Sequence, residues 1–370
     1  MNVIASFLST LLVALPALPD PLTTPLTFPQ MSSTTLPAVE GTAEVPASDV
    51  ATSDTKLAAT RHIHDNLYEI DIYSASMDRV ITNNLLLPPG GPDNTTPRPT
   101  FYLMQGSYGG ERGDTWATAT DYESLFRGKN VNVVSPIGGD GTLFYDWKST
   151  TTPVGTAKWM TYYTQELPFI METQFHATDK RAIAGLSASG APALNIAEAY
   201  PDKYVAVASL SGYTAVSSTM GRIMSLGVTA AKMAPVWGMF GWPDDPEWLH
   251  YDPILHVDKL KNTKVYFYSG SGLEKDGFGT VQRGMFWNGV MEYLVRLTNN
   301  PFVAQARGAG VDVTYDREAY GIHDWPYYKD ALGKSWTKVI GPALGAYVTH
   351  FSFGFHVPRA CGAVVAPFLN

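Results

Sequence analysis

The sequence has a single cysteine, Cys361, among its 370 residues. An intrachain disulfide needs two cysteines, so none can form. The eight histidines are scattered, and neither a His-Glu-x-x-His string nor a Cys/His cluster occurs, so we expect no metal site and no cofactor. Charged residues are also few, at 16%. The net charge is −8, and lysine and arginine form no cluster in the sequence. A nucleic-acid partner is therefore not expected.

Long hydrophobic runs are scarce as well. The apolar run at residues 3–18 is too short for a comfortable membrane span but has the length of a signal-peptide core. We therefore predict that residues 1–18 are a signal peptide and that the protein is secreted. Residues 19–60 are rich in Pro, Thr, Ser and Ala without periodicity, which predicts a flexible linker. The folded domain is then expected at residues 61–340, and residues 341–370 form a tail to which no role is assigned.

Short apolar runs that end in glycine-rich loops alternate with helical stretches such as residues 158–173. This alternation predicts an α/β fold with a mostly parallel central sheet and helices on both faces. Ligands of such sheets bind at the carboxyl ends of the strands, where the glycine-rich loops lie. Residues 213–263 contain Met, Gly, Pro and Trp without a strand pattern and are predicted to be an inserted cap or lid. Six runs are read as strands: 67–73, 80–87, 100–104, 131–134, 205–210 and 264–268.

The most informative string is residues 181–190, where a short apolar run enters Gly185-Leu186-Ser187 and a small-residue helical stretch leaves it. This is the strand–turn–helix setting of a nucleophile elbow, in which the turn lifts the serine hydroxyl above the sheet. The usual pattern is Gly-x-Ser-x-Gly, and Ser189 stands here in place of the second glycine. A serine held in this way typically attacks an acyl carbon. The alternative reading is a plain Gly/Ser turn.

A serine nucleophile needs a histidine base from another part of the chain, which in α/β hydrolases follows the acid in sequence. His323 is the preferred base because it lies in a glycine-containing loop followed by an aromatic run. The other downstream histidines are His250, His256, His350 and His356.

The acid cannot be chosen from the residues alone. Glu274 and Asp276 follow the strand that ends at Tyr268, whereas Glu292 lies in a helix-like stretch and could simply pair with Arg296 one turn later. Asp312 and Asp316 are further options.

Several strings, taken in order, resemble the mycoloyltransferases of mycolic-acid bacteria, the antigen 85 type, in the esterase branch of the α/β-hydrolase fold. The resemblance covers about residues 65–340, nearly the whole folded part. The strings are YLMQG (102–106), PIGG (136–139), YDW (145–147), ELP (166–168), GLS (185–187), SG (211–212), GMFG (238–241), DPEW (245–248), DP (252–253) and HDW (323–325).

The resemblance implies a triad of Ser187, Glu292 and His323. It implies an oxyanion hole made by the backbone amides of Ser107 and Ala188, where side-chain identity is free to vary. A cysteine that the family carries at a strand end is Ser269 here.

The resemblance also implies a sugar site. A family tryptophan beside that site corresponds to Trp325, but the Asp and Arg that grip trehalose in the family read Gln105 and Tyr108 here. The implied donor is trehalose monomycolate. The implied acceptor is a cell-envelope hydroxyl: trehalose, whose case the two replacements weaken, cell-wall arabinan or a protein hydroxyl.

Two other functions remain open at this stage. A secreted carboxylesterase would use the same triad with water as acceptor. A non-catalytic envelope-binding protein on the same fold would usually lack a triad member, and this chain retains candidates for all three.

Overall fold

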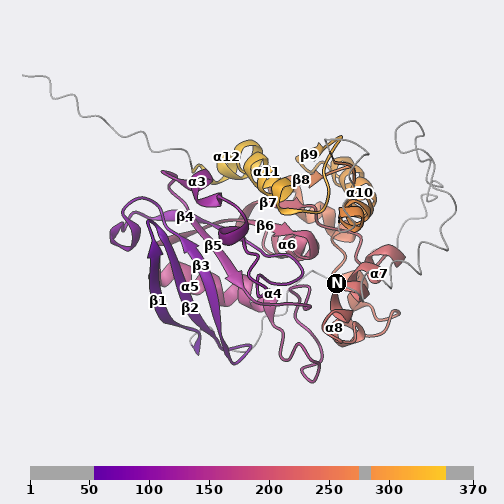
Figure 1. Ribbon diagram of the computed structural model, residues 1–370, viewed down its shortest axis with the longest axis horizontal. Coiled ribbons are helices and arrows are strands. Elements are labelled where there is room, and N and C mark those ends of the chain that lie inside the picture. Colours follow the sequence, from indigo (N-terminus) through magenta and orange to yellow (C-terminus); the bar gives the residue numbers. More distant parts are fainter. Residues whose placement is uncertain (1–53, 275–284, 347–370) are drawn as a thin grey trace, which may run out of the picture.

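The computed structural model describes residues 54–274 and 285–346, which form one nine-stranded sheet with helices around it (Figure 1). The spatial order of the strands is β1-β2-β3-β5-β4-β6-β7-β8-β9. The strands are β1 (Lys56–His64), β2 (Leu67–Ser74), β3 (Arg79–Leu86), β4 (Arg98–Leu103), β5 (Asn132–Ile137), β6 (Ala177–Leu186), β7 (Tyr204–Leu210), β8 (Lys264–Ser269) and β9 (Val313–Arg317).

Strands β4 to β9 pair in parallel, and β1 to β3 add an antiparallel ribbon at one edge through the β3–β5 pair. The predicted α/β fold with a mostly parallel sheet is therefore confirmed, and the six expected runs are strands, as is β6, the strand expected to enter the elbow. Two further strands, β1 and β9, were not anticipated. β1 also corrects the linker prediction, because residues 56–60 belong to this strand. Residues 1–53, which hold the predicted signal peptide and most of the predicted linker, and residues 347–370 with Cys361 lie outside the described residues.

Helices cover both faces of the sheet because alternate side chains of each central strand point to opposite sides. On β4, Tyr102 faces one core and Phe101 the other. The first core is covered by α5 (Leu167–Gln174), α6 (Gly190–Ala199) and α10 (Met285–Gly308). The second is covered by α2 (Trp116–Ala119), α3 (Tyr122–Phe126), α11 (Trp325–Ser335), the π-helix η6 (Trp336–Ile340) and α12 (Gly341–Leu344).

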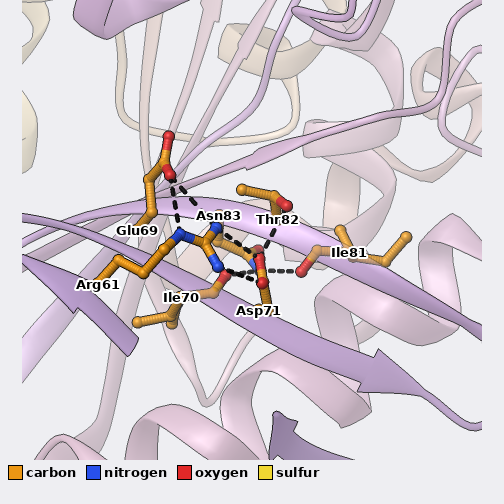
Figure 2. A network of polar contacts seen from close by, with 7 residues as sticks. All are labelled: Arg61, Glu69, Ile70, Asp71, Ile81, Thr82 and Asn83. Carbon is orange, nitrogen blue, oxygen red and sulfur yellow. Dashed lines mark hydrogen bonds and ion pairs between the residues drawn. The ribbon is translucent and has the colours of Figure 1, made fainter. Parts of the chain in front are cut away.

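The antiparallel edge is joined by a polar network on its exposed side. Figure 2 shows Arg61 of β1 between Glu69 and Asp71 of β2, with Thr82 of β3 donating to Asp71 at 2.8 Å. The Arg61 guanidinium lowers the pKa of the Asp71 carboxyl, because it donates hydrogen bonds to the charged form. This side-chain network joins β1, whose residues are mostly exposed, to the rest of the sheet.

Residues 213–263 fold as short helices and loops with no strand. They contain α7 (Thr219–Ala230), α8 (Trp237–Phe240), α9 (Glu247–His250) and the 3-10 helix η5 (Pro253–Asn262). The remaining short helices of the fold are η2 (Gly91–Asp93), α4 (Trp159–Thr161), the π-helix η3 (Tyr162–Glu166) and the 3-10 helix η4 (Ser187–Ser189).

This segment, 213–263, is called the cap below. The cap contacts the loop that follows β5: Lys232 of the cap forms an ion pair with the buried carboxylate of Asp140 in that loop, at 2.9 Å.

Candidate active site

Ser187 stands at the turn between β6 and α6 in a left-handed conformation, with φ of 55°. A non-glycine residue rarely adopts this region, and its presence at a strand-to-helix turn marks a strained functional position. The turn closes only because Gly185 has no side chain: a Cβ there would lie 2.1 Å from the Ser189 carbonyl oxygen. Likewise, Gly190 approaches Gly212 so closely that a Cβ on either would lie 2.6 Å from the other's Cα.

The contacts of Ser189 account for a serine at a position that is usually glycine. It is fully buried, and its Oγ accepts from the Leu186 amide at 2.7 Å. The same Oγ donates to the Gln105 carbonyl at 2.8 Å. The hydroxyl therefore ties the elbow to the loop after β4, a link that glycine could not make.

Three side chains from distant parts of the chain meet in one hydrogen-bonded line. His323 Nε2 lies 2.7 Å from Ser187 Oγ, and His323 Nδ1 lies 2.8 Å from Glu292 Oε2. This is the nucleophile–base–orienter geometry of an acyl-transfer triad. The Tyr328 ring packs edge-on to the imidazole at 5.3 Å, and burial raises the pKa of its phenol, which keeps Tyr328 neutral.

Glu292 is fully buried, and its second oxygen has two donors. Oε1 accepts from Ser211 Oγ at 2.8 Å and from the Gly270 amide at 2.7 Å. Together with His323, these bonds satisfy both oxygens of the carboxylate, which a buried charge requires. Ser211 also has a left-handed φ of 51°. Sequence reasoning gave Ser211 and Gly270 no role at the site, although both lie where strands β7 and β8 end in glycine-containing loops.

Two of the other candidate acids are paired with other side chains. Asp312 pairs with Lys264, and Asp316 accepts from Lys338 and from the Tyr266 hydroxyl. Asp276 lies outside the described residues. The expected alternative in which Glu292 pairs with Arg296 is not what the structure shows, since the Arg296 guanidinium donates to the carbonyls of Ser269 and Glu318.

The loop after β4 passes over the elbow. A Cβ on Gly106 would be 3.8 Å from the Leu186 side chain, and the Gly106 carbonyl accepts from the Gly109 amide at 2.9 Å. The Gly106–Ser107 peptide is trans, so its carbonyl and its N–H point in opposite directions. The hydrogen bond from Gly109 to that carbonyl therefore turns the Ser107 N–H away from Gly109. Ala188, the other predicted amide, is buried directly after Ser187.

The three predicted substrate contacts have different surroundings. The Gln105 side chain is fully buried and donates to Ser135 Oγ at 2.8 Å, so its amide faces the interior of the protein. Tyr108 is half-buried, with the Arg112 guanidinium 3.7 Å from its ring centre. Trp325 begins α11, two residues after His323, and packs edge-on to Trp116 at 5.3 Å.

Within residues 54–274 and 285–346, no group of three or more His, Cys, Asp or Glu side chains is arranged to hold a metal ion. In the same ranges, no helix combines the length and the apolar character needed to cross a membrane.

Comparison of the sequence with known proteins identifies the family of the chain. The family described as "Putative esterase" matches residues 74–337, more than half of the chain. The diacylglycerol acyltransferase/mycolyltransferase Ag85A of Mycobacterium gordonae is 31% identical over 271 residues, 70% of this chain and 76% of that protein. Ag85C of Mycobacterium avium is 28% identical over 71% of this chain and 74% of that protein.

Solved structures show the same fold. MPT51 (FbpC1) of Mycobacterium tuberculosis superposes with a TM-score of 0.62 at 25% identity, covering 77% of this chain and 99% of that one. FphF, a fluorophosphonate-binding serine hydrolase of Staphylococcus aureus, gives a TM-score of 0.55 at 17% identity, covering 73% and 96%. The sheet and helices described above are therefore those of α/β-hydrolase esterases.

Proposed function

We propose, since this chain belongs to the Esterase family and is a distant homologue of the Ag85 mycolyltransferases, that it is a secreted acyltransferase. It moves a mycoloyl group from a trehalose monomycolate-type donor to a hydroxyl acceptor in the cell envelope, through an ester on Ser187. The observation that carries the proposal is the hydrogen-bonded line from Ser187 through His323 to Glu292.

In the first step, Ser187 Oγ attacks the ester carbonyl carbon while His323 Nε2 takes the hydroxyl proton. Glu292 orients the imidazole and stabilises its protonated form. The negative charge that develops on the carbonyl oxygen is stabilised by the Ser107 and Ala188 amides. The C–O bond to the donor sugar then breaks, and His323 returns its proton to the leaving oxygen. This leaves the acyl group on Ser187.

In the second step, the acceptor hydroxyl gives its proton to His323 and attacks the acyl carbon. The new ester leaves, and Ser187 regains the proton. Water in place of the acceptor would give hydrolysis, the reaction that the family description indicates. The same triad serves both outcomes, so the acceptor decides between transferase and esterase.

Exposed apolar side chains on the cap favour a lipid acyl chain as the group that is transferred. Met233, Trp237 and Trp242 are 86%, 46% and 64% exposed, and the two tryptophan rings stack at 5.2 Å. Large apolar side chains gathered on one surface segment indicate contact with apolar ligands or surfaces. The buried amide of Gln105 favours an acceptor other than trehalose, because its position corresponds to the sugar-gripping Asp of the resembled family.

The proposal is tested by product analysis. Residues 54–370 and their Ser187→Ala variant are incubated with trehalose monomycolate alone and with trehalose, arabinan or a serine-containing peptide. A new mycoloyl ester that needs both the acceptor and Ser187 supports acyl transfer and identifies the acceptor. Release of free mycolic acid under every condition would instead support the esterase.

A further inference from the structure

One face of α10 holds the loop that carries His323 at three successive turns. The Asn288 carbonyl accepts from the His323 amide at 3.0 Å, and the Glu292 carboxylate accepts from the His323 ring. One turn further on, Arg296 donates to the carbonyl of Glu318, five residues before His323. Residues spaced by four lie on the same side of a helix, so the three contacts form a row.

Arg296 also reaches the other partner of Glu292. Its Nη2 donates to the Ser269 carbonyl at 2.9 Å, while the N–H of the same peptide bond, that of Gly270, donates to Glu292 at 2.7 Å. Two side chains one helical turn apart therefore hold the two ends of one planar peptide group. If that peptide rotated, the Gly270 N–H would turn away from the carboxylate.

The Ser269–Gly270 peptide is in turn fitted against the His323 loop. A Cβ on Gly270 would lie 2.3 Å from the Gly321 carbonyl, and that carbonyl accepts from the Gly272 amide at 2.8 Å. The Ser269 carbonyl also accepts from the Glu318 amide at 3.0 Å. Arg296 is thus the side chain common to both segments, and it is buried at 8% exposure, with no carboxylate bound to its guanidinium among the contacts described.

We propose that Arg296 is a positioning residue for acyl transfer. It fixes the Gly270 amide on Glu292 and the Glu318–His323 loop relative to Ser187, without touching the substrate. This inference rests on the proposed function of the triad. A displacement of about 1 Å at a reacting group can cost on the order of 10² in rate, so loss of these bonds should slow the chemistry more than it weakens substrate binding.

The test compares Arg296→Met with Arg98→Met. Arg98 is 1% exposed and likewise donates to two carbonyls, those of Asn94 and Phe175, but it begins β4 at the end of the sheet opposite the triad. Each purified protein is reacted with a small serine-directed phosphonate, and the labelling rate of Ser187 is followed by intact mass below the melting temperature. The downfield proton resonance of His323 Nδ1–H is recorded in parallel.

We expect both variants to melt at a lower temperature, but only Arg296→Met to label about 10²-fold more slowly and to lose the His323 resonance. Arg296→Lys, which keeps a donor on a shorter chain, should recover part of the rate, and it takes the place of Arg296→Met if that variant fails to fold. Equal labelling by wild type and Arg296→Met would overturn the inference, and so would equal slowing in Arg98→Met. Absence of labelling in the wild type would refute the proposed function instead, and the His323 resonance would then decide the role of Arg296.

Discussion

Glu292 accepts from His323 Nδ1 at 2.8 Å while lying fully buried beneath it. Replacing Glu292 with glutamine keeps the shape but offers an amide N–H or a neutral oxygen, so the imidazolium loses its counter-charge and its ring loses the required tautomer. We predict that Glu292→Gln lowers kcat by about 10³–10⁴. The matched control is Glu274→Gln at the rejected acid position, which should retain wild-type kcat in a chromogenic ester assay. A large loss in the control and not in Glu292→Gln would reverse the assignment.

Gly109 is predicted to be essential for the oxyanion amide. A Cβ there would lie 2.2 Å from the Gly138 carbonyl oxygen, so Gly109→Ala must displace the turn that orients Ser107 N–H. We expect a fall in kcat of about 10²–10³, the usual cost of one oxyanion donor. Gly113 is the control, since its φ of 94° is also left-handed but nothing lies within 4 Å of a Cβ there. Similar kcat values for Gly109→Ala and Gly113→Ala would contradict this role of the turn.

The exposed tryptophans of the cap are predicted to bind the acyl chain. In the double variant Trp237→Ser/Trp242→Ser, kcat/KM for long-chain esters should fall about 10-fold or more, because the apolar contact of two indole rings is lost. Turnover of acetyl or butyryl esters should be unchanged. Ile63→Ser removes an exposed apolar side chain from β1 at the far edge of the sheet and should alter neither. An equal effect on short and long esters would rule out a chain-binding role.

A buried carboxyl on α6, the helix that follows the nucleophile, should make the stability of the fold depend on pH in an unusual way. Burial raises the pKa of Glu198 well above its ordinary value. The folded state then holds a proton that the unfolded state has released, so stability falls as pH rises above the unfolded pKa of about 4.3. Glu198→Gln should therefore melt higher than wild type at pH 7, and the gap should shrink toward pH 4.

Asp71 provides a control of opposite sign in the same thermal melts. Its pKa is lowered by Arg61, so its stabilising contribution is present above the unfolded pKa and disappears as pH falls through the lower folded pKa. Asp71→Asn should melt below wild type at pH 7 and match it at low pH. A pH-independent gap for Glu198→Gln would show that this carboxyl does not carry the predicted proton.

Local signals in the sequence were sufficient for the elbow and the central strands. Ser187 is flanked by small residues and enters a helix, and each buried strand is a compact apolar run with a glycine-rich end. These features follow from backbone geometry within about ten residues. Glu292 was different, since five carboxylates were equally plausible until the family resemblance favoured one. Its role depends on which helix face packs against the ends of β7 and β8, which is a tertiary property.

The sequence analysis did not predict β1 and β9, and each omission has a physical reason. β1 has mostly exposed residues and little apolar alternation, and its pairing with β2 specifies it more than its own composition does. β9 is five residues long and includes Asp316, which the sequence analysis considered as a candidate acid. The role of Arg296 was not predicted either. Its spacing from Glu292 indicated an ion pair, whereas in the structure its guanidinium donates to carbonyls of two loops.

The most direct test of the central claim is the mass of the protein itself. Residues 54–370 are mixed with a mycoloyl ester donor, quenched in acid and digested, and the peptide bearing the acyl group is identified. The account predicts a mycoloyl adduct on Ser187 that builds up within a turnover, is discharged by an alcohol acceptor and is absent in Ser187→Ala. An adduct on another residue, or turnover that survives Ser187→Ala, would contradict it.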